Sequence, residues 1–381
     1  MKTVSPSLLL VAGILLLCPA TDAAQRRGNR GAAAVPATGS RHFDISGLTA
    51  VNAVGADRSG HPFDTRNATL NVFANPNTAG ITFRTSWAAV EPTEGTFDFD
   101  KIDSVFTNAD AHGKWVDLIL IPGFFTPDWA LRGVQTVTCA IKYGPGSADS
   151  EPRPLPVSWD RTYLSRWFAF LQAIGRRYAD RPSLKMIAAA GPTSVSAEMS
   201  LPDTAADLVQ WRRAAYTSEK YIDAWKQTFA VYASTFPHQY FSLALYPGLP
   251  IPDRREATPT REKIIALGVQ YPTQFALEED GLNASRTEEA FGYRAVLDHI
   301  GQVATGFMMS TSAFEKSERM GANGDPPLAL RKSIDLGMAR NAAGRHVDFL
   351  EIYEPDITAP EMQSVLQYGA SLFTHGPGGG R

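Results

Sequence analysis

Short apolar runs recur along the chain, and longer segments with helical spacing separate them. Residues 116–121 and 186–190 are almost continuously apolar, which is typical of parallel strands that are covered on both faces. Residues 81–87 instead alternate between apolar and polar positions, as a strand with two different faces does. Further strands are predicted over residues 47–54, 240–246, 273–278, 305–310 and 347–353.

The segments between these strands carry apolar stripes with the period of an α-helix. One stripe consists of Leu164, Trp167, Phe168, Leu171, Ile174 and Tyr178, and a second of Tyr221, Ala224, Trp225, Thr228, Phe229 and Tyr232. Eight strands that alternate with about as many helices predict an α/β fold, the (β/α)8 TIM barrel, with these stripes packed against it. An open doubly wound sheet is the alternative fold, but the chain lacks the glycine fingerprint of its nucleotide-binding versions.

The two ends of the chain differ from the part between them. Lys2, an apolar run over residues 8–17 and small residues at 20–24 together resemble a secretory signal, so we expect residues 1–24 to be a signal peptide. Residues 25–40 are predicted to be a flexible leader, residues 41–375 a single catalytic barrel, and residues 376–381 a disordered tail. This organisation predicts a secreted or periplasmic protein that has no membrane contact after the signal is removed.

Composition and charge narrow the possible partners. Of the 381 residues 44% are hydrophobic and 20% charged, and the net charge of −3 gives no reason to expect nucleic acid as a partner. The seven histidines are scattered without metal-ligand spacing, and no cofactor motif is found, so we expect neither a metal nor a cofactor. Without the signal peptide Cys139 is the only cysteine, so no internal disulfide is expected.

A motif follows the strand at 81–87. It consists of Trp87, Val90-Glu91-Pro92, Glu94-Gly95, Phe97-Asp98-Phe99 and Ile102-Asp103. These residues resemble the W-x-x-[LV]-E-P-x-x-G-x-[FY]-D-[FW]-x-x-[IL]-D stretch of the family 42 β-galactosidases, which belong to clan A of the (β/α)8-barrel glycoside hydrolases. The Thr126-Pro127 pair followed by Trp129 is also similar. The resemblance implies a glycosidase that cleaves O-glycosidic bonds of an oligo- or polysaccharide with paired carboxylates and without a cofactor.

Glu198 is the first candidate catalytic residue. It follows the strand at 186–190, and active sites of such barrels lie at the carboxyl ends of the strands. By resemblance it corresponds to the clan's strand-4 acid/base, and Arg84 to the arginine that supports the nucleophile. The sequence departs from the clan at Ala197, where the clan has asparagine, and in the longer loop between strand and carboxylate.

A second carboxylate is needed for glycoside hydrolysis. The seventh predicted strand, 305–310, has no acid where the clan's nucleophile stands. Alternation in the strand 347–353 turns Glu351 toward the barrel interior, so Glu351 is the predicted partner, with Glu278 and Glu354 as alternatives. An ion pair with Arg84 that only stabilises the barrel is the other interpretation of Glu351. A separation above ~6 Å from Glu198 would favour inversion of the anomeric centre.

Aromatic and polar side chains near the strand ends are the candidates for sugar binding. They are Trp87, Phe124, Trp129, Tyr246, Glu278, Asn283 and Tyr353. An aromatic ring can stack on a pyranose face, although each of these aromatic residues could equally belong to the core.

Two other classes of function remain open. A non-catalytic carbohydrate-binding barrel that has lost its nucleophile would explain the missing strand-7 acid. An aldolase- or lyase-type barrel would need a lysine at the carboxyl end of a strand, whereas Lys114 and Lys185 precede their strands.

Overall fold

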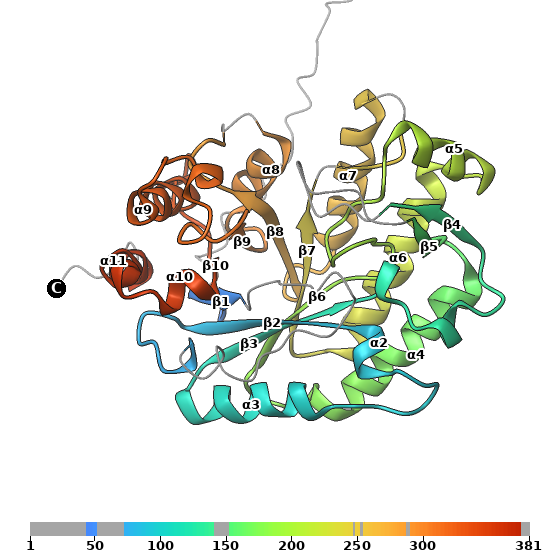
Figure 1. Cartoon of the computed structure of the whole chain (residues 1–381), viewed down its shortest axis with the longest axis horizontal. Helices are drawn as coiled ribbons and strands as arrows, with labels where there is room; N and C mark the ends of the chain where they lie inside the picture. Colours follow the sequence, from blue (N-terminus) through green and yellow to red (C-terminus); the bar gives the residue numbers. More distant parts are fainter. Residues whose placement is uncertain are drawn as a thin grey trace, which may run out of the picture. The chain divides into compact units, whose positions relative to one another are not determined.

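The computed structural model describes residues 43–51, 72–140, 152–246, 248–251, 254–286 and 290–374. In this part of the chain eight strands form a closed barrel in the order β1-β10-β9-β8-β7-β6-β3-β2, and every neighbouring pair is parallel (Figure 1). The barrel strands are β1 (Gly47–Val51), β2 (Gly80–Ser86), β3 (Trp115–Ile121), β6 (Leu184–Ala188), β7 (Tyr240–Leu245), β8 (Phe275–Leu282), β9 (Ala304–Met309) and β10 (Phe349–Tyr353). The predicted (β/α)8 barrel is confirmed.

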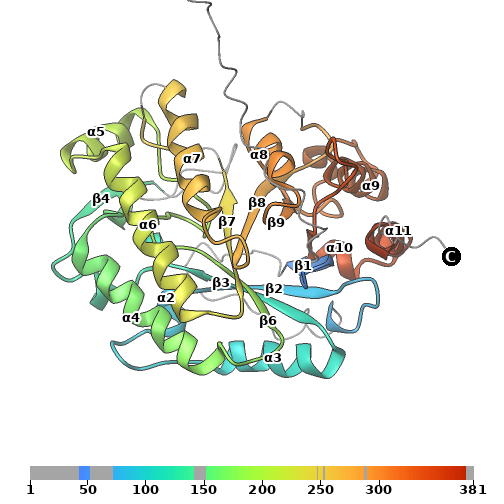
Figure 2. The same ribbon diagram turned by 180° about the vertical axis from the view of Figure 1, so that it is seen from behind.

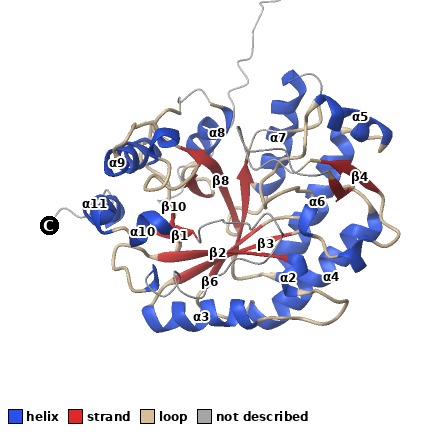
Figure 3. Cartoon of the chain, viewed as in Figure 1, coloured by secondary structure: helices blue, strands red, loops and turns tan. Residues whose placement is uncertain are grey.

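Helices connect the strands and cover the outside of the barrel (Figure 3). They are α2 (Trp87–Val90), α3 (Asp100–His112), α4 (Arg161–Tyr178), α5 (Ala205–Arg213), α6 (Ser218–Thr235), α7 (Arg254–Gly268), α8 (Phe291–His299), α9 (Pro326–Gly337), α10 (Glu354–Thr358) and α11 (Gln363–Thr374). Four single turns of 3₁₀ helix accompany them: η1 (Gly123–Phe125), η2 (Asp128–Leu131), η3 (Ser317–Met320) and η4 (Pro360–Met362).

The two apolar stripes predicted from the sequence lie on α4 and α6. Asp160 caps α4 by accepting a hydrogen bond of 3.0 Å from the Tyr163 N–H, and Thr217 caps α6 in the same way through the Lys220 N–H at 3.3 Å. Figure 2 shows the two helices side by side. Their tryptophans, Trp167 and Trp225, are fully buried, so the predicted packing is confirmed.

Two differences from the predicted elements matter for the site. An antiparallel hairpin, β4 (Thr136–Cys139) and β5 (Arg153–Pro156), stands between β3 and α4 and was not predicted. Strand β8 continues to Leu282, four residues beyond its predicted end, because Glu279 still pairs with Phe307 of β9 and Leu282 with Met309.

Apolar side chains, five of them large, fill the barrel at the amino ends of its strands. This layer contains Phe43, Ile45, Trp115, Met186, Ala276, Ala304 and Phe349. Gly306 leaves the space that the Phe349 ring occupies, since a Cβ at this position would lie 2.3 Å from that ring. The lower half of the barrel is therefore a packed core.

Alternation along the strands fixes which residues face inward above this layer. Two residues beyond the apolar layer the inward positions include three acids: Asp117 on β3, Glu278 on β8 and Glu351 on β10. Two residues further on they are Asp280 on β8 and Tyr353 on β10. The barrel interior thus changes from apolar to acidic toward the carboxyl ends of the strands.

The predicted signal peptide, leader and tail lie outside the described residues. None of the described helices is long and apolar enough to cross a membrane. The domain boundaries given above remain predictions.

Candidate active site

Glu198 lies at the end of a detour that the chain makes after β6. The strand ends at Ala188, and the chain returns to the barrel at Met199, whose N–H donates to the Ala244 carbonyl of β7 at 2.8 Å. Met199 also pairs with Leu245 in a short parallel bridge. Glu198 is therefore held at the carboxyl end of the barrel, between β6 and β7, as the sequence predicts.

Buried aromatic side chains of α4 and α6 hold the start of this detour. The four hydrogen bonds run from Tyr163 Oη to the Gly191 carbonyl (2.7 Å), from Trp167 Nε1 to the Ala190 carbonyl (2.6 Å), from Tyr221 Oη to the Pro192 carbonyl (3.0 Å) and from the Ala190 N–H to Tyr232 Oη (3.0 Å). All four aromatic residues are 0% exposed. Buried backbone groups need hydrogen-bond partners, and these contacts supply them for residues 190–192. This segment is therefore held rigidly in the interior, and we call it the platform beneath Glu198.

A second contact holds the later part of the detour. The Phe124 N–H in η1 donates to the Ser194 carbonyl at 2.9 Å. Gly123 allows this approach because its φ is +61° and because a Cβ there would lie 2.0 Å from the Ser194 carbonyl oxygen. The loop after β3 and the loop after β6 therefore support each other beside Glu198.

The Glu198 carboxyl is half-buried. Burial raises its pKa above the ordinary range, and both Arg84 and a hydrogen bond from Ser196 oppose this rise. A carboxyl with a raised pKa at the carboxyl end of a barrel strand can hold a proton for transfer to a substrate.

Asp280 is the second acid at this end of the barrel, and the sequence analysis missed it. It is half-buried and faces inward from the extension of β8. Burial raises its pKa well above the usual range, and the charges of Glu278 and Glu198 raise it further while Arg84 opposes them. The acidic run Glu278-Glu279-Asp280 at the end of an apolar strand was the available signal, since alternation turns its first and third members inward.

Arg84 is the cation whose charge acts on both of these acids, and its predicted role of supporting the nucleophile stays a prediction. Its guanidinium lies 5.9 Å from the centre of the Tyr353 ring and contacts Met308 on the other side of the barrel. Burial lowers its pKa, but the charges of Tyr353, Asp280, Glu351 and Glu198 outweigh burial, and the pKa is raised. Arg84 is thus permanently charged and interacts with both carboxyls of the mouth.

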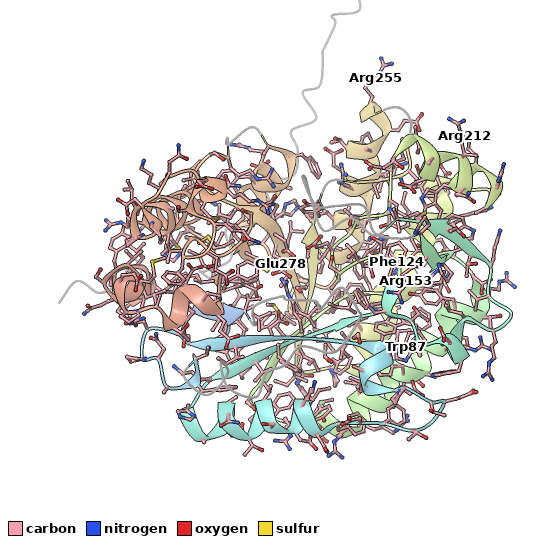
Figure 4. The ribbon with its side chains drawn as sticks, in the orientation of Figure 1. Trp87, Phe124, Arg153, Arg212, Arg255 and Glu278 are labelled. Atoms are coloured by element: carbon pink, nitrogen blue, oxygen red, sulfur yellow. The ribbon has the colours of Figure 1, made fainter. Side chains whose placement is uncertain are left out.

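Three further carboxyls lie beneath the mouth. Asp117, Glu278 and Glu351 are 0%, 2% and 1% exposed. Glu351 faces inward as predicted and accepts a hydrogen bond of 2.6 Å from the Thr82 hydroxyl. Both Glu351 and Glu278 lie deeper than the mouth acids, and Figure 4 places Glu278 inside the ring of strands. The predicted roles, Glu351 as the second catalytic carboxylate and Glu278 as a substrate-binding residue, stay predictions.

Two of the predicted sugar-binding aromatics belong to the core. Trp87 is 0% exposed, its Nε1 donates to Glu91 Oε2 at 2.9 Å, and its ring packs 5.2 Å from that of Trp167. In Figure 4 it lies at α2, well away from Glu278. Phe124 is 4% exposed and packs in the same apolar cluster. Both predictions of substrate contact are corrected by this burial.

The other predicted binding residues are partly exposed. Tyr246 and Tyr353 flank the mouth acids, because Glu198 acts on the pKa of both and Arg84 contacts Tyr353. Trp129 is half-buried, and its Nε1 donates to the Glu91 carbonyl at 3.1 Å. Asn283 uses its amide in a turn, accepting from the Ser285 N–H at 3.0 Å and donating to the Gly281 carbonyl at 3.1 Å. The two tyrosines are therefore the best placed for a substrate.

No group of three or more His, Cys, Asp or Glu side chains in the described part of the chain is arranged to hold a metal ion. Cys139 is buried, and burial followed by the charge of Asp207 raises the pKa of its thiol, so it is an inert thiol rather than a nucleophile.

Comparisons with known proteins agree with the fold and with the motif. The family model Glyco_hydro_42, described as beta-galactosidase, matches residues 66–236, a range that contains both Arg84 and Glu198. No curated protein sequence matches the chain.

Two similar solved structures are complexes of endo-glycoceramidase II from Rhodococcus sp. The lactosyl-enzyme intermediate is 14% identical, with 85% of this chain and 79% of that chain covered and a TM-score of 0.51. The complex with a five-membered iminocyclitol is also 14% identical, with 85% and 80% covered and a TM-score of 0.50. At this identity the likeness shows the fold, which is the closed parallel barrel described above.

The predicted resemblance is therefore confirmed, and the class of the matching family model is the predicted one, a glycosidase. The chain is a closed (β/α)8 barrel, and its residues 66–236 are similar to the family 42 β-galactosidases, a family of glycosidases.

Proposed function

We propose that this protein hydrolyses O-glycosidic bonds with Glu198 and Asp280 as its pair of carboxyl groups. The observation that carries the proposal is that both are half-buried at the carboxyl end of the barrel, interact with each other and share the cation Arg84. Such a pair meets the requirement of glycoside hydrolysis for one acid that protonates the leaving oxygen and one ionised carboxylate.

The charges around the two acids support a division of roles. Asp280 faces Glu278 and Glu351 as well as Glu198, whereas Glu198 has Arg84 and the Ser196 hydroxyl as its strongest neighbours. These neighbours favour the protonated form of Asp280 and the ionised form of Glu198. We assign proton donation to Asp280 and attack on the anomeric carbon, or activation of water, to Glu198. This is the reverse of the role that the resemblance gives to Glu198.

Tyr246 and Tyr353 would line the sugar-binding part of the mouth. Each presents an apolar ring face and a hydroxyl, a combination suited to the C–H face and the hydroxyls of a sugar. The substrate class follows as an oligo- or polysaccharide or another O-glycoside, and the sugar and linkage are to be found by screening.

The test is a screen of the purified protein on aryl glycosides and on plant and microbial oligosaccharides. We expect turnover of at least one substrate, a loss of at least about a thousandfold in kcat for Glu198→Gln and Asp280→Asn, and no change for the control Asp128→Asn on the exposed start of η2. Retained turnover in both site variants would refute the assignment.

A non-catalytic carbohydrate-binding barrel is the second candidate. It is favoured by β9, which ends at Met309 and is followed by Ser310, Thr311 and Ser312, so the clan's usual carboxylate is missing there. Binding of an oligosaccharide without turnover, in the parent protein and in Glu198→Gln alike, would support this candidate over the enzyme.

We also propose that the protein is exported. The support is the pattern of residues 1–24, which resembles a signal peptide. The mass of the protein recovered from the medium or periplasm tests this: we expect a chain that has lost about these residues, and a full-length chain in the cytoplasm would contradict export.

A further inference from the structure

The carboxyl of Asp117 lies inside the barrel without a conventional hydrogen-bond donor. The residue is 0% exposed, and neither of its carboxyl oxygens accepts a hydrogen bond from an N–H or O–H group of the described residues. A buried carboxylate without a donor is strongly destabilising, so another arrangement must satisfy these oxygens.

The neighbour within hydrogen-bonding reach of Asp117 is another carboxyl, that of Glu351. Two ionised carboxylates in contact would repel each other, whereas one proton between them converts the contact into a hydrogen bond. A metal ion could also join two carboxylates, but the described residues contain no group of three ligands for one. A proton shared between the two carboxyls therefore accounts for a contact in which neither oxygen of Asp117 has another donor among the described residues.

The surroundings decide which of the two carboxyls is ionised. Glu351 accepts the Thr82 hydroxyl at 2.6 Å and lies close enough to Arg84 for their charges to interact. Thr82 is itself within 3.2 Å of the Thr49 hydroxyl. The charged or titratable groups that act on Asp117 are Glu351 on β10, Arg84 on β2, and Asp280 and Glu278 on β8. Glu351 has the better partners and is the anion, so Asp117 carries the proton.

We propose that Asp117 is a positioning residue that donates a shared proton to Glu351 and thereby keeps one negative charge directly beneath Arg84. The chain of contacts runs from Asp117 through Glu351 to Arg84, and from Arg84 to Glu198 and Asp280 at the mouth. Loss of the proton adds a second negative charge below Arg84, which draws the guanidinium away from the mouth acids. The shared proton and its contribution to stability are independent of the proposed function. The effect of the proton on activity through Arg84 rests on that function.

The matched variants are Asp117→Asn, whose amide N–H₂ can donate to Glu351 but cannot titrate, and Asp117→Leu, which has no donor. Asp128→Asn, at an exposed position, is the control. Each protein is unfolded with urea at a series of pH values between 5 and 9.

The direction in which stability changes with pH follows from the direction in which the pKa of Asp117 is shifted. Burial, and then the charge of Glu351, raises the pKa of Asp117 well above its ordinary value. The stability that its proton contributes is complete below the unfolded pKa of about 3.9 and is lost as pH rises through the folded pKa. Between the unfolded and the folded pKa, unfolding of the parent releases one proton that Asp117→Asn does not release. The folding equilibrium constant of the parent therefore falls by up to about tenfold more per pH unit than that of Asp117→Asn.

For activity we expect Asp117→Asn to keep kcat within about threefold at pH 6 and to extend the basic limb of the pH profile, and Asp117→Leu to lose about tenfold or more. Equal pH slopes for the parent and Asp117→Asn would overturn the shared proton. Equal kcat values and pH profiles for the parent, Asp117→Asn and Asp117→Leu would overturn the positioning role. If no glycoside is turned over, the proposed function fails, and the unfolding series still decides whether the proton is shared.

Discussion

The platform beneath Glu198 depends on hydroxyl groups whose removal leaves the ring packing intact. Tyr163→Phe removes a single oxygen that donates to the Gly191 carbonyl at 2.7 Å, and Tyr221→Phe removes the donor to the Pro192 carbonyl at 3.0 Å. Both tyrosines are 0% exposed, so water cannot replace the lost donor without a rearrangement. Tyr221→Phe leaves the Pro192 carbonyl without a donor among the described residues, whereas the Gly191 carbonyl keeps the Thr193 N–H as a donor at 2.8 Å.

The magnitude of the loss of stability follows from what each carbonyl keeps. An unsatisfied buried acceptor costs about 1–3 kcal/mol, so Tyr221→Phe should lower the free energy of unfolding by that amount. Tyr163→Phe removes one of two hydrogen bonds to the Gly191 carbonyl and should lower it by about 0.5–1.5 kcal/mol. The double variant should lose less than the sum, because the two carbonyls are adjacent and the segment relaxes as a unit. Since the detour positions Glu198, kcat should fall while KM changes little.

Urea unfolding followed by fluorescence gives the free energies, and Tyr368→Phe is the control. Its hydroxyl donates to Asp335 at 2.6 Å on the exposed surface, where loss of the contact should cost less than about 1 kcal/mol. If Tyr163→Phe and Tyr221→Phe are no less stable than Tyr368→Phe, the account of a rigid platform is refuted.

Three further substitutions test other parts of the barrel. Asp356→Ala should cost about 3 kcal/mol in unfolding experiments, because the buried carboxyl accepts hydrogen bonds from the backbone N–H groups of Ala313 at 3.1 Å and Phe314 at 2.6 Å. Burial raises the pKa of Asp348 to about 7, so the parent should lose stability between about pH 4 and pH 7 relative to Asp348→Asn; melting temperatures that change equally over this range would contradict this. Gly306→Ala should destabilise the barrel by about 1–3 kcal/mol through the clash with Phe349, and unchanged stability would show that the apolar layer is loosely packed.

Much of the fold could be predicted because its strands are buried on both faces. A continuous apolar run such as 116–121 is explained by a strand that is buried on both faces. The stripes of α4 and α6 are explained by apolar residues that repeat with the helical period and are buried against the barrel. The position of Glu198 followed from the same reasoning, since a residue after a parallel strand must lie at the carboxyl end of the barrel. The details of its detour could not be predicted, because they depend on four hydrogen bonds from helices that are distant in sequence.

The composition of the site was harder to predict, and the errors have specific causes. Asp280 was missed because Glu278-Glu279-Asp280-Gly281 has the composition of a solvated turn, whereas pairing with β9 and the Glu279–Arg286 ion pair extend the strand. Trp87 was assigned to sugar binding because it ends a strand, but it begins α2 and turns outward between the barrel and α4. Alternation gave the inward direction of Glu351, but it could not give its depth below the mouth.

The most direct test of the central claim is the dependence of kcat/KM on the pKa of the leaving phenol for a series of aryl glycosides. If Asp280 is the proton donor, Asp280→Asn should lose little activity on the most acidic phenols and progressively more on the least acidic ones, while Glu198→Gln loses activity on all of them alike. The opposite pattern, with the steep dependence in Glu198→Gln, or the absence of any turnover by the parent protein, would contradict the account.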